Sequence, residues 1–427
     1  MNCQELREDI EKLTNLKEDF EAKFEDGYES GIGKIAIDEA FKTAAEFSDE
    51  LLGKYLQDFA EKNPELFGGW QMSELIEGFG NNPVYAIAAL PDGSALVGGG
   101  YGALYHAAKG LDGKFGLSER IEGFKNVYGD ITYMNSIAAL PDGGALVGGN
   151  RGALYHAAKG PDGKFSLGEL IEGFVSAYDL QQDIDAVAVL PDGSTLMGGG
   201  DGALYHAAKG PDGKFSLGER IDGFKNAHGD ITYVNGIAVL SDSGALVGGN
   251  YGALYHATKG PDGKFSLGEL IEGIGNNSVY SIATLPDGSA LVGGTHGALY
   301  HATKGPDGSF SLGKRIEGFK DVDGNSADVC AIDTLPEGSA LVGGDRGALY
   351  YATKGPDGSF SLGEQIDGFK NVHGNIVYVN SIAVLPDGSA LVGGSNGALC
   401  HATKPELSVA TLKQNLDKIT DKDIDNT

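Results

Sequence analysis

The hexapeptide Gly-Ala-Leu-Tyr-His-Ala returns seven times along this chain of 427 residues and constrains the fold more than any other feature. The sixth copy reads GALYYA and the last reads GALCHA, and the successive spacings are 50, 50, 50, 45, 50 and 50 residues. Units of this size cannot bury their apolar faces singly, so the repeat predicts a stack or a closed ring. The copies begin at Gly102, Gly152, Gly202, Gly252, Gly297, Gly347 and Gly397.

One repeat contains four β-like runs, which we call A to D. In the copy at 234–273 they are VNGIAVL (run A), GALVGG (run B), GALYHATKG (run C) and KFSLGELIEG (run D). A Ser-Asp-Ser or Pro-Asp-Gly turn separates A from B and C from D, and a two-residue turn at Asn250-Tyr251 separates B from C. The runs do not alternate between apolar and polar residues, as expected of strands covered on both faces. Four strands per unit is the pattern of propeller blades.

The strand count predicts a closed ring rather than a solenoid. Seven A-B-C sets are present, but only six D runs follow them, because the last set ends at Lys404. The seventh D run, SELIEGF at 73–79, precedes the first A run. The first strand therefore completes the last blade, which leaves no unpaired edge.

Residues 70–404 resemble the seven-bladed β-propeller repeat proteins, and the short repeats look most like those of bacterial sensor ectodomains. The blades depart from the WD type, since the chain has one tryptophan, Trp70, and no Trp-Asp dipeptide closes a repeat. The resemblance implies an all-β, WD40-like seven-bladed propeller of four-stranded blades. It implies no particular activity, because propellers carry many unrelated functions.

The segments on either side of the repeats change character. In 1–69, apolar residues such as Leu6, Ile10 and Leu13 recur at helical spacing, and a second such stretch covers 37–62. The acidic tail 405–427 repeats the pattern with Leu412 and Leu416. We expect an α-helical N-terminal segment and a short helical tail flanking the propeller, through which the chain could oligomerise.

Composition excludes several classes of partner. The formal net charge is -28 and the 32 basic residues are dispersed, which disfavours binding to nucleic acid or to an anionic membrane. The chain contains no apolar run of membrane-spanning length and no signal peptide, and its three cysteines are too scattered for a disulfide framework. These features favour a cytoplasmic protein, and nothing in the sequence calls for a cofactor.

The repeated histidine of run C raises the possibility of a metal site. Run C is third from the axis of a propeller blade, so these side chains should lie far apart, one at each seam between blades. A metal ion needs several ligands in one coordination sphere. We therefore expect packing histidines whose ring nitrogens have strand or turn partners. The positions are His106, His156, His206, His256, His301 and His401, with Tyr351 in the remaining copy.

Two other patterns suggest sites only weakly. DVDGNSAD at 321–328 has a calcium-loop spacing of acids, but Ser326 and Ile332 stand where an EF-hand needs glycine and glutamate, so an acidic turn is favoured over calcium. The GPDGKFSL turns resemble the Asp-box of sialidases, yet Asp162 and Gly163 are adjacent and the box is not met. No blade shows singular polar residues directed at the axis, so we expect no catalytic site.

Variation between the repeats indicates a binding surface. The A–B and C–D turns are nearly constant, whereas the B–C turns and the D–A connections differ in every blade. Since strand direction alternates, the two variable sets should share one rim. We predict a non-catalytic module that binds a protein or peptide there; the alternatives are a multivalent lectin and an enzyme at the channel mouth. The predicted contact residues are Tyr101, Arg151, Asp201, Tyr251, His296, Arg346, Asn396, Tyr133, Tyr233 and Tyr378.

Overall fold

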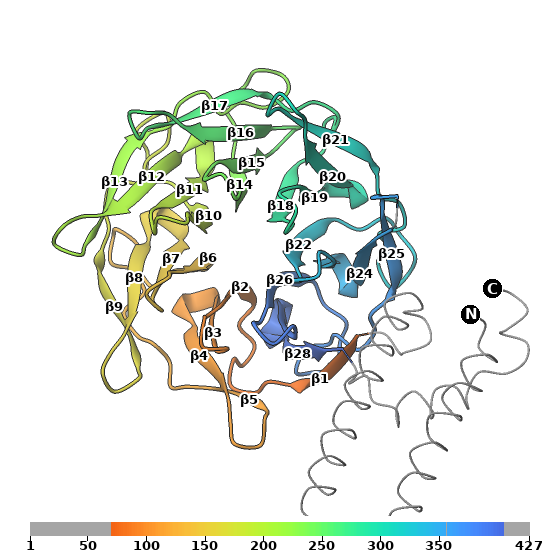
Figure 1. Ribbon diagram of the computed structural model, residues 1–427. Coiled ribbons are helices and arrows are strands. Elements are labelled where there is room, and N and C mark those ends of the chain that lie inside the picture. Colours follow the sequence, from red (N-terminus) through yellow and green to blue (C-terminus); the bar gives the residue numbers. More distant parts are fainter. Residues whose placement is uncertain (1–69, 356, 405–427) are drawn as a thin grey trace, which may run out of the picture. The chain divides into compact units, whose positions relative to one another are not determined.

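Seven four-stranded antiparallel sheets surround a central axis in the computed structural model, which describes residues 70–355 and 357–404 (Figure 1). Residues Gln71–Thr403 form one compact unit. Each sheet runs A-B-C-D outward, with strand A nearest the axis. The prediction of an all-β seven-bladed propeller is confirmed, while the predicted helices of 1–69 and 405–427 lie outside the described residues. None of the helices in the described ranges has the length and apolar character to cross a membrane.

The blades are numbered 1 to 7 from the first A strand. The A strands are β2 (Val84–Ala89), β6 (Met134–Ala139), β10 (Ile184–Val189), β14 (Val234–Val239), β18 (Val279–Thr284), β22 (Val329–Thr334) and β26 (Val379–Val384). The B strands are β3 (Ala95–Gly99), β7 (Ala145–Gly149), β11 (Thr195–Gly199), β15 (Ala245–Gly249), β19 (Ala290–Gly294), β23 (Ala340–Gly344) and β27 (Ala390–Gly394).

The two outer strands of each blade follow the same order. The C strands are β4 (Leu104–Lys109), β8 (Leu154–Lys159), β12 (Leu204–Lys209), β16 (Leu254–Lys259), β20 (Leu299–Lys304), β24 (Leu349–Lys354) and β28 (Leu399–Thr403). The D strands are β5 (Phe115–Leu117), β9 (Phe165–Leu170), β13 (Phe215–Arg220), β17 (Phe265–Leu270), β21 (Phe310–Arg315), β25 (Phe360–Gln365) and β1 (Gln71–Leu75).

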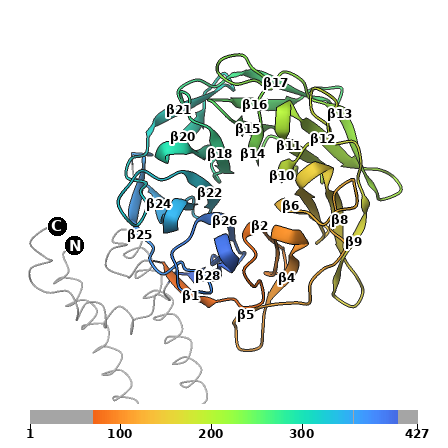
Figure 2. The ribbon, with the colours of Figure 1, turned by 180° about the vertical axis from the view of Figure 1, so that it is seen from behind.

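The ring closes as the strand count predicts. Strand β1 pairs antiparallel with β28, with Gln71 opposite Thr403 and Leu75 opposite Cys400. Figure 2 shows the first strand beside the last one, at the junction of blades 7 and 1. The last blade is therefore built from both ends of the propeller, and the edge of β28 is paired as in the other C strands.

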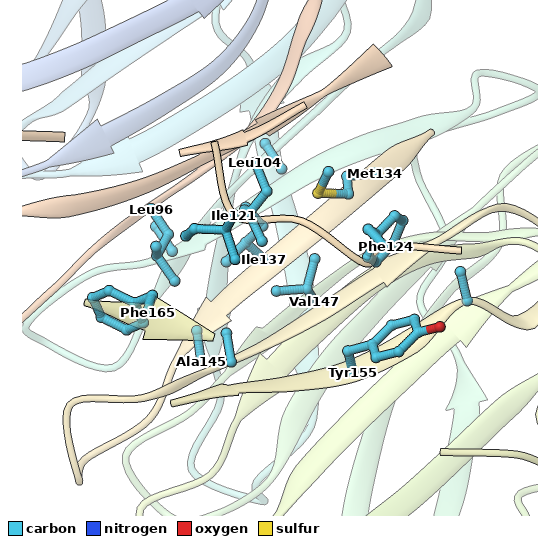
Figure 3. Packing of buried hydrophobic residues seen from close by; sticks show 14 of the residues in the cluster. Leu96, Leu104, Ile121, Phe124, Met134, Ile137, Ala145, Val147, Tyr155 and Phe165 are labelled. Atoms are coloured by element: carbon cyan, nitrogen blue, oxygen red, sulfur yellow. The ribbon is translucent and has the colours of Figure 1, made fainter. Parts of the chain in front are cut away.

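The core lies between blades rather than within any one of them. Strand B is buried along its whole length in every blade. At the junction of blades 1 and 2, Leu96 and Leu104 of blade 1 pack against Ile137, Val147 and the neighbouring buried side chains of blade 2 (Figure 3). A single repeat has no such partner, so burial requires the array.

A glycine pair ends every B strand because two neighbours approach it closely. A Cβ atom on Gly198 would lie 2.2 Å from Cγ1 of Val234 in the next blade, and one on Gly199 would lie 1.9 Å from the carbonyl oxygen of Asp183. Both distances are far below van der Waals contact. The first glycine thus makes room for the A strand of the next blade, and the second for the start of the A strand of its own blade.

The repeated histidine belongs to a chain of contacts across each seam. Between blades 1 and 2, Nε2 of His106 lies 2.8 Å from Oγ of Ser94, which donates to Asp92. Asp92 is paired with Lys159 of the next blade at 2.7 Å. The ammonium group of Lys159 lies 5.8 Å from the Phe165 ring centre, and that ring packs against His106 at 5.1 Å between ring centres. The prediction of seam histidines with turn partners is confirmed at this seam.

Two seams lack the serine and therefore lack one contact. Gly144 and Gly244 replace it in blades 2 and 4, and the buried Nε2 atoms of His156 and His256 have no hydrogen-bond partner among the described residues. Their rings still pack on a phenylalanine of the next blade, at 5.5 Å for His156 and 5.1 Å for His256. Ring packing is therefore the shared feature of the histidine seams, and the hydrogen bond is an addition to it.

Candidate functional site

Every B–C connection is a tight turn with left-handed backbone at both central residues. In blade 1, Ala103 donates its N–H to the Gly100 carbonyl at 3.0 Å, and Tyr101 has φ 54° and ψ 39°. The following Gly102 has φ 64°. This is the turn that matches the twist of adjacent strands. It is centred one residue later than the sequence predicts, on Tyr251-Gly252 rather than Asn250-Tyr251 in blade 4.

The first central residue is non-glycine in all seven turns. Left-handed backbone suits asparagine and aspartate but crowds the Cβ of larger side chains. Histidine is also enriched there, so three of the seven positions carry favoured types and four hold tyrosine or arginine against the local preference. The residues are Tyr101, Arg151, Asp201, Tyr251, His296, Arg346 and Asn396.

Five D–A connections form small hairpins, each held by one β-bridge and one capping side chain. In the first, Oδ1 of Asn126 accepts the N–H groups of Tyr128 at 2.9 Å and Asp130 at 3.0 Å. Serine, asparagine or aspartate does the same in the others. The bridges join Lys125 to Ile131, Val175 to Gln181, Lys225 to Ile231, Lys320 to Ser326 and Lys370 to Ile376.

The acidic segment 321–328 is one of these hairpins. Oδ1 of Asp321 accepts the N–H groups of Asp323 at 2.9 Å and Asn325 at 2.8 Å, which is the role of Asn126 in the first hairpin. Asp323 pairs with Arg346, and Asp328 accepts the N–H of His296 at 2.7 Å. Each acid of the calcium-like pattern thus has a partner within the loop or the adjacent turn.

The B–C turns and D–A connections contact each other and form one rim, the variable face. Gly102 donates to the Thr132 carbonyl at 2.7 Å, and Asn150 donates to the Tyr133 carbonyl at 3.1 Å. On this face the Tyr133 ring lies 5.2 Å from that of Tyr101 and 6.1 Å from that of Tyr85, measured between ring centres. Three tyrosines therefore form a cluster on the variable face where blades 1 and 2 meet.

Exposed apolar side chains gather on the variable face. Of the fourteen large hydrophobic residues that are exposed in the described part of the chain, thirteen lie in its turns and connections or at the start of an A strand; the exception, Leu111, lies in a C–D turn. The thirteen are Tyr85, Tyr101, Tyr128, Ile131, Tyr178, Leu180, Ile231, Tyr233, Tyr251, Val322, Val372, Ile376 and Tyr378.

The ten predicted contact residues all lie on the variable face, but their surroundings differ. Tyr101, Tyr233, Tyr251 and Tyr378 are exposed, whereas Tyr133 is half-buried in the tyrosine cluster. Arg346 forms ion pairs with Asp321 and Asp323 of the D–A hairpin that precedes blade 6. The predicted contact residues do not include the exposed apolar side chains of the hairpins. Their signal in the sequence is an apolar residue within each of the five D–A hairpin segments.

A second feature lies on the axis, at the end of the channel that the A–B turns surround. A cavity of about 900 Å³, wide open to solvent at its mouth, is lined there by the last residues of the seven A strands and by the Leu-Pro pairs that follow them, or Leu-Ser in blade 4. The polar side chains of its wall are confined to three neighbouring blades: Ser241 in blade 4, Thr284 in blade 5, and Asp333 and Thr334 in blade 6. The other blades contribute alanine, valine, leucine and proline.

Asp333 contradicts the expectation that no blade directs a singular polar residue at the axis. Its position holds alanine in the other six blades. Its carboxylate accepts the N–H of Val384 at 2.7 Å and that of Thr334 at 2.8 Å. Desolvation raises the pKa of Asp333 to about 6 despite these two bonds. The signal is present in the sequence, as one aspartate at a position that is alanine in the other six repeats.

Comparison with solved structures places the fold among propellers. The WD40 β-propeller domain of Doa1 has a TM-score of 0.59 at 17% identity, with 81% of this chain and 99% of that chain covered. The extracellular domain of a protein described as a hybrid two component system from B. thetaiotaomicron has a TM-score of 0.55 at 16% identity, covering 78% of this chain and 40% of that one. At such identities the likeness concerns the fold alone. No protein-family model matches the sequence, and no curated protein matches it.

Proposed function

We propose that this chain is a non-catalytic binding module that recognises a protein or peptide partner on its variable face. The observation that carries the proposal is that, in the described part of the chain, thirteen of the fourteen exposed large hydrophobic residues lie on that face. Scattered apolar residues are normal on a soluble protein, but a concentration on one face is typical of an interaction surface. Seven of the thirteen are tyrosines, and tyrosine, like the arginines of the B–C turns, is a residue type that anchors interfaces.

Backbone strain supports the same face. A bulky residue in left-handed backbone costs about 1–3 kcal/mol, and such strain is concentrated at functional sites. Asp201 and Asn396 show that the favoured residue types fit the same turn. Tyr101, Arg151 and Tyr251 are nevertheless present, although selection for stability alone would favour asparagine or aspartate at these positions. Selection for their side chains explains their persistence.

The seams do not favour the lectin alternative. A multivalent lectin would need an open pocket between each pair of blades. The seam of blades 1 and 2 is instead occupied by the ring of His106 against Phe165 and by the Lys159–Asp92 ion pair. The same histidine–phenylalanine packing recurs at the five other seams where run C carries histidine.

The test replaces Tyr101, Arg151 and Tyr251 together by asparagine, which left-handed backbone tolerates. We expect stability to rise by roughly 0.5–1 kcal/mol per site because strain is relieved. Partner capture should fall at least about a hundredfold if two of the three act as interface anchors. Thermal unfolding gives the first quantity, and quantitative mass spectrometry of proteins captured by the full chain gives the second.

The matched control replaces Lys114, Lys164 and Lys214 by alanine on the opposite rim. Each lysine forms an ion pair with a glutamate of the preceding blade, and both partners are largely exposed, so stability should barely change. Loss of capture in the control with retention in the asparagine variant would contradict the proposal. Saturable binding on a glycan array, unaltered by the asparagine substitutions, would favour the lectin instead.

A further inference from the structure

The axial cavity has an apolar side and a polar side, although the repeat would make it uniform. Blades 1, 2, 3 and 7 line it with Ala, Val, Leu and Pro alone. Blades 5 and 6 contribute Thr284, Thr334 and Asp333, and the Thr334 hydroxyl donates to the Thr284 carbonyl at 2.8 Å. Asp333 is the one titratable side chain among the described residues that line the cavity. The departures from the repeat thus cluster at one wall.

The link between the A strands of blades 6 and 7 does not require a charged side chain such as Asp333. Its bond to the Val384 N–H links blade 6 to blade 7. Three other seams make comparable links between A strands with the neutral hydroxyls of Ser136, Ser281 and Ser381, which accept the N–H groups of the next blade at 2.9–3.0 Å. A serine or asparagine could serve the link without the cost of desolvating a charge.

We propose that the axial cavity binds a compact ligand with an apolar body and one protonated amine, and that the ammonium group pairs with the Asp333 carboxylate. This site lies at the A–B end of the channel and is independent of the partner proposed for the variable face. The volume of about 900 Å³ is within the range of small-molecule sites. Such sites are mostly apolar, with few polar groups that orient the ligand.

The arrangement selects for both parts of the ligand. Alanine, valine, leucine and proline of four blades offer dispersion and desolvation to an apolar body. Each oxygen of Asp333 accepts one backbone N–H and keeps a further lone pair for a donor. A charge-assisted hydrogen bond is roughly twice as strong as one between neutral groups, so a neutral alcohol of the same shape should bind more weakly.

The experiment compares cyclohexylmethylamine with its neutral counterpart cyclohexylmethanol on the full chain at pH 7.5, by isothermal titration calorimetry. We expect the amine to bind saturably at one site. Asp333→Asn should weaken the amine about tenfold or more and leave the alcohol unchanged, since asparagine retains an acceptor for Val384. Asp212→Asn, which removes an exposed carboxylate of a C–D turn, is the charge-matched control and should leave both affinities as they are.

A second variant guards against a folding defect at Asp333. Ala139→Phe, on the apolar side of the cavity, should occupy part of the space for the apolar body and weaken binding of the amine and the alcohol together. The site is refuted if the amine fails to saturate, or if either Asp333→Asn or Ala139→Phe binds it as the wild type does. Binding lost on Asp212→Asn to the same degree as on Asp333→Asn would also refute it, because the attraction would then be general to an acidic protein.

Discussion

Single residues in this propeller can be judged against six other copies of themselves. The sequence pattern alone predicted the seam position of the histidines, because run C is third from the axis in any such blade. It could not predict that Gly144 and Gly244 would leave two Nε2 atoms without partners. That outcome depends on a hydroxyl twelve residues away in the chain, in the A–B turn of the same blade. Likewise, the variability of Tyr101 and its equivalents was visible in the sequence, whereas their left-handed backbone was not.

Gly144→Ser should stabilise the protein by about 1 kcal/mol, because it supplies the hydroxyl that His156 lacks. Gly144 does not have positive φ, so serine is allowed by the backbone. Its Cβ would lie 2.9 Å from the Ala157 carbonyl, so the turn must shift slightly. Chemical denaturation measures the change.

The reciprocal variant Ser194→Gly is the control and should destabilise by about the same amount, since it leaves Nε2 of His206 without the 2.8 Å contact. If Gly144→Ser is neutral while Ser194→Gly is damaging, the serine contributes through turn geometry rather than through histidine.

At the scale of elements, the seam is the unit of stability. Burial lowers the pKa of all six run C histidines, and a lysine of the next blade lowers it further. At the same seams, hydrogen bonds from lysine and serine lower the pKa of Asp92 and Asp192. The sequence predicted the four runs and their turns, but not this linkage, because it joins residues 67 positions apart across a seam.

Acidification should therefore destabilise the propeller. The unfolded chain binds protons on histidine near pH 6.5 and the folded chain only at lower pH, so the stability contributed is complete above 6.5 and falls below it. Asp185 and Asp333, whose pKa burial raises to about 6, oppose this between about pH 4 and 6. Because six histidines lower the free energy of unfolding on acidification and only two aspartates raise it, we expect a net loss of stability.

Denaturant unfolding at pH 7.5, 6.5 and 5.5 measures this effect, with unfolding free energy expected to decrease at the lowest pH. His206→Gln removes one titrating group and should flatten the profile, although it lowers stability at pH 7.5. A profile that stays level between pH 7.5 and 5.5 in the wild type would show that the histidines are as free to protonate in the fold as in the unfolded chain.

At the scale of the whole molecule, closure is what the sequence predicted best and the axial cavity what it predicted least. Counting D runs was enough to place 73–79 in the last blade, since only this arrangement gives every C strand a D strand to pair with. The cavity arises where seven A strands converge, and no single repeat contains it. In a single repeat, Asp333 is one alanine-to-aspartate substitution; its place in the wall of the cavity follows only from the arrangement of all seven A strands.

Closure gives a final prediction. We propose that Gln71–Thr403 folds by itself, and that a chain beginning at Ile76 lacks only strand β1 while retaining the buried Ile76 and Phe79. The shorter chain should lose roughly 2–4 kcal/mol of stability from the missing ladder and should self-associate through the exposed edge of β28. Calorimetry and analytical ultracentrifugation report the two effects.

A peptide covering Gln71–Leu75 with a few flanking residues should restore the monomer and most of the lost stability, because it can pair with β28 in the native register. A peptide of the same composition in scrambled order should not, since the apolar side chains would then face the wrong side of the strand. If the chain from Ile76 is already monomeric and as stable as the chain from Gln71, β1 is an accessory strand and six complete blades with a three-stranded seventh suffice for the ring.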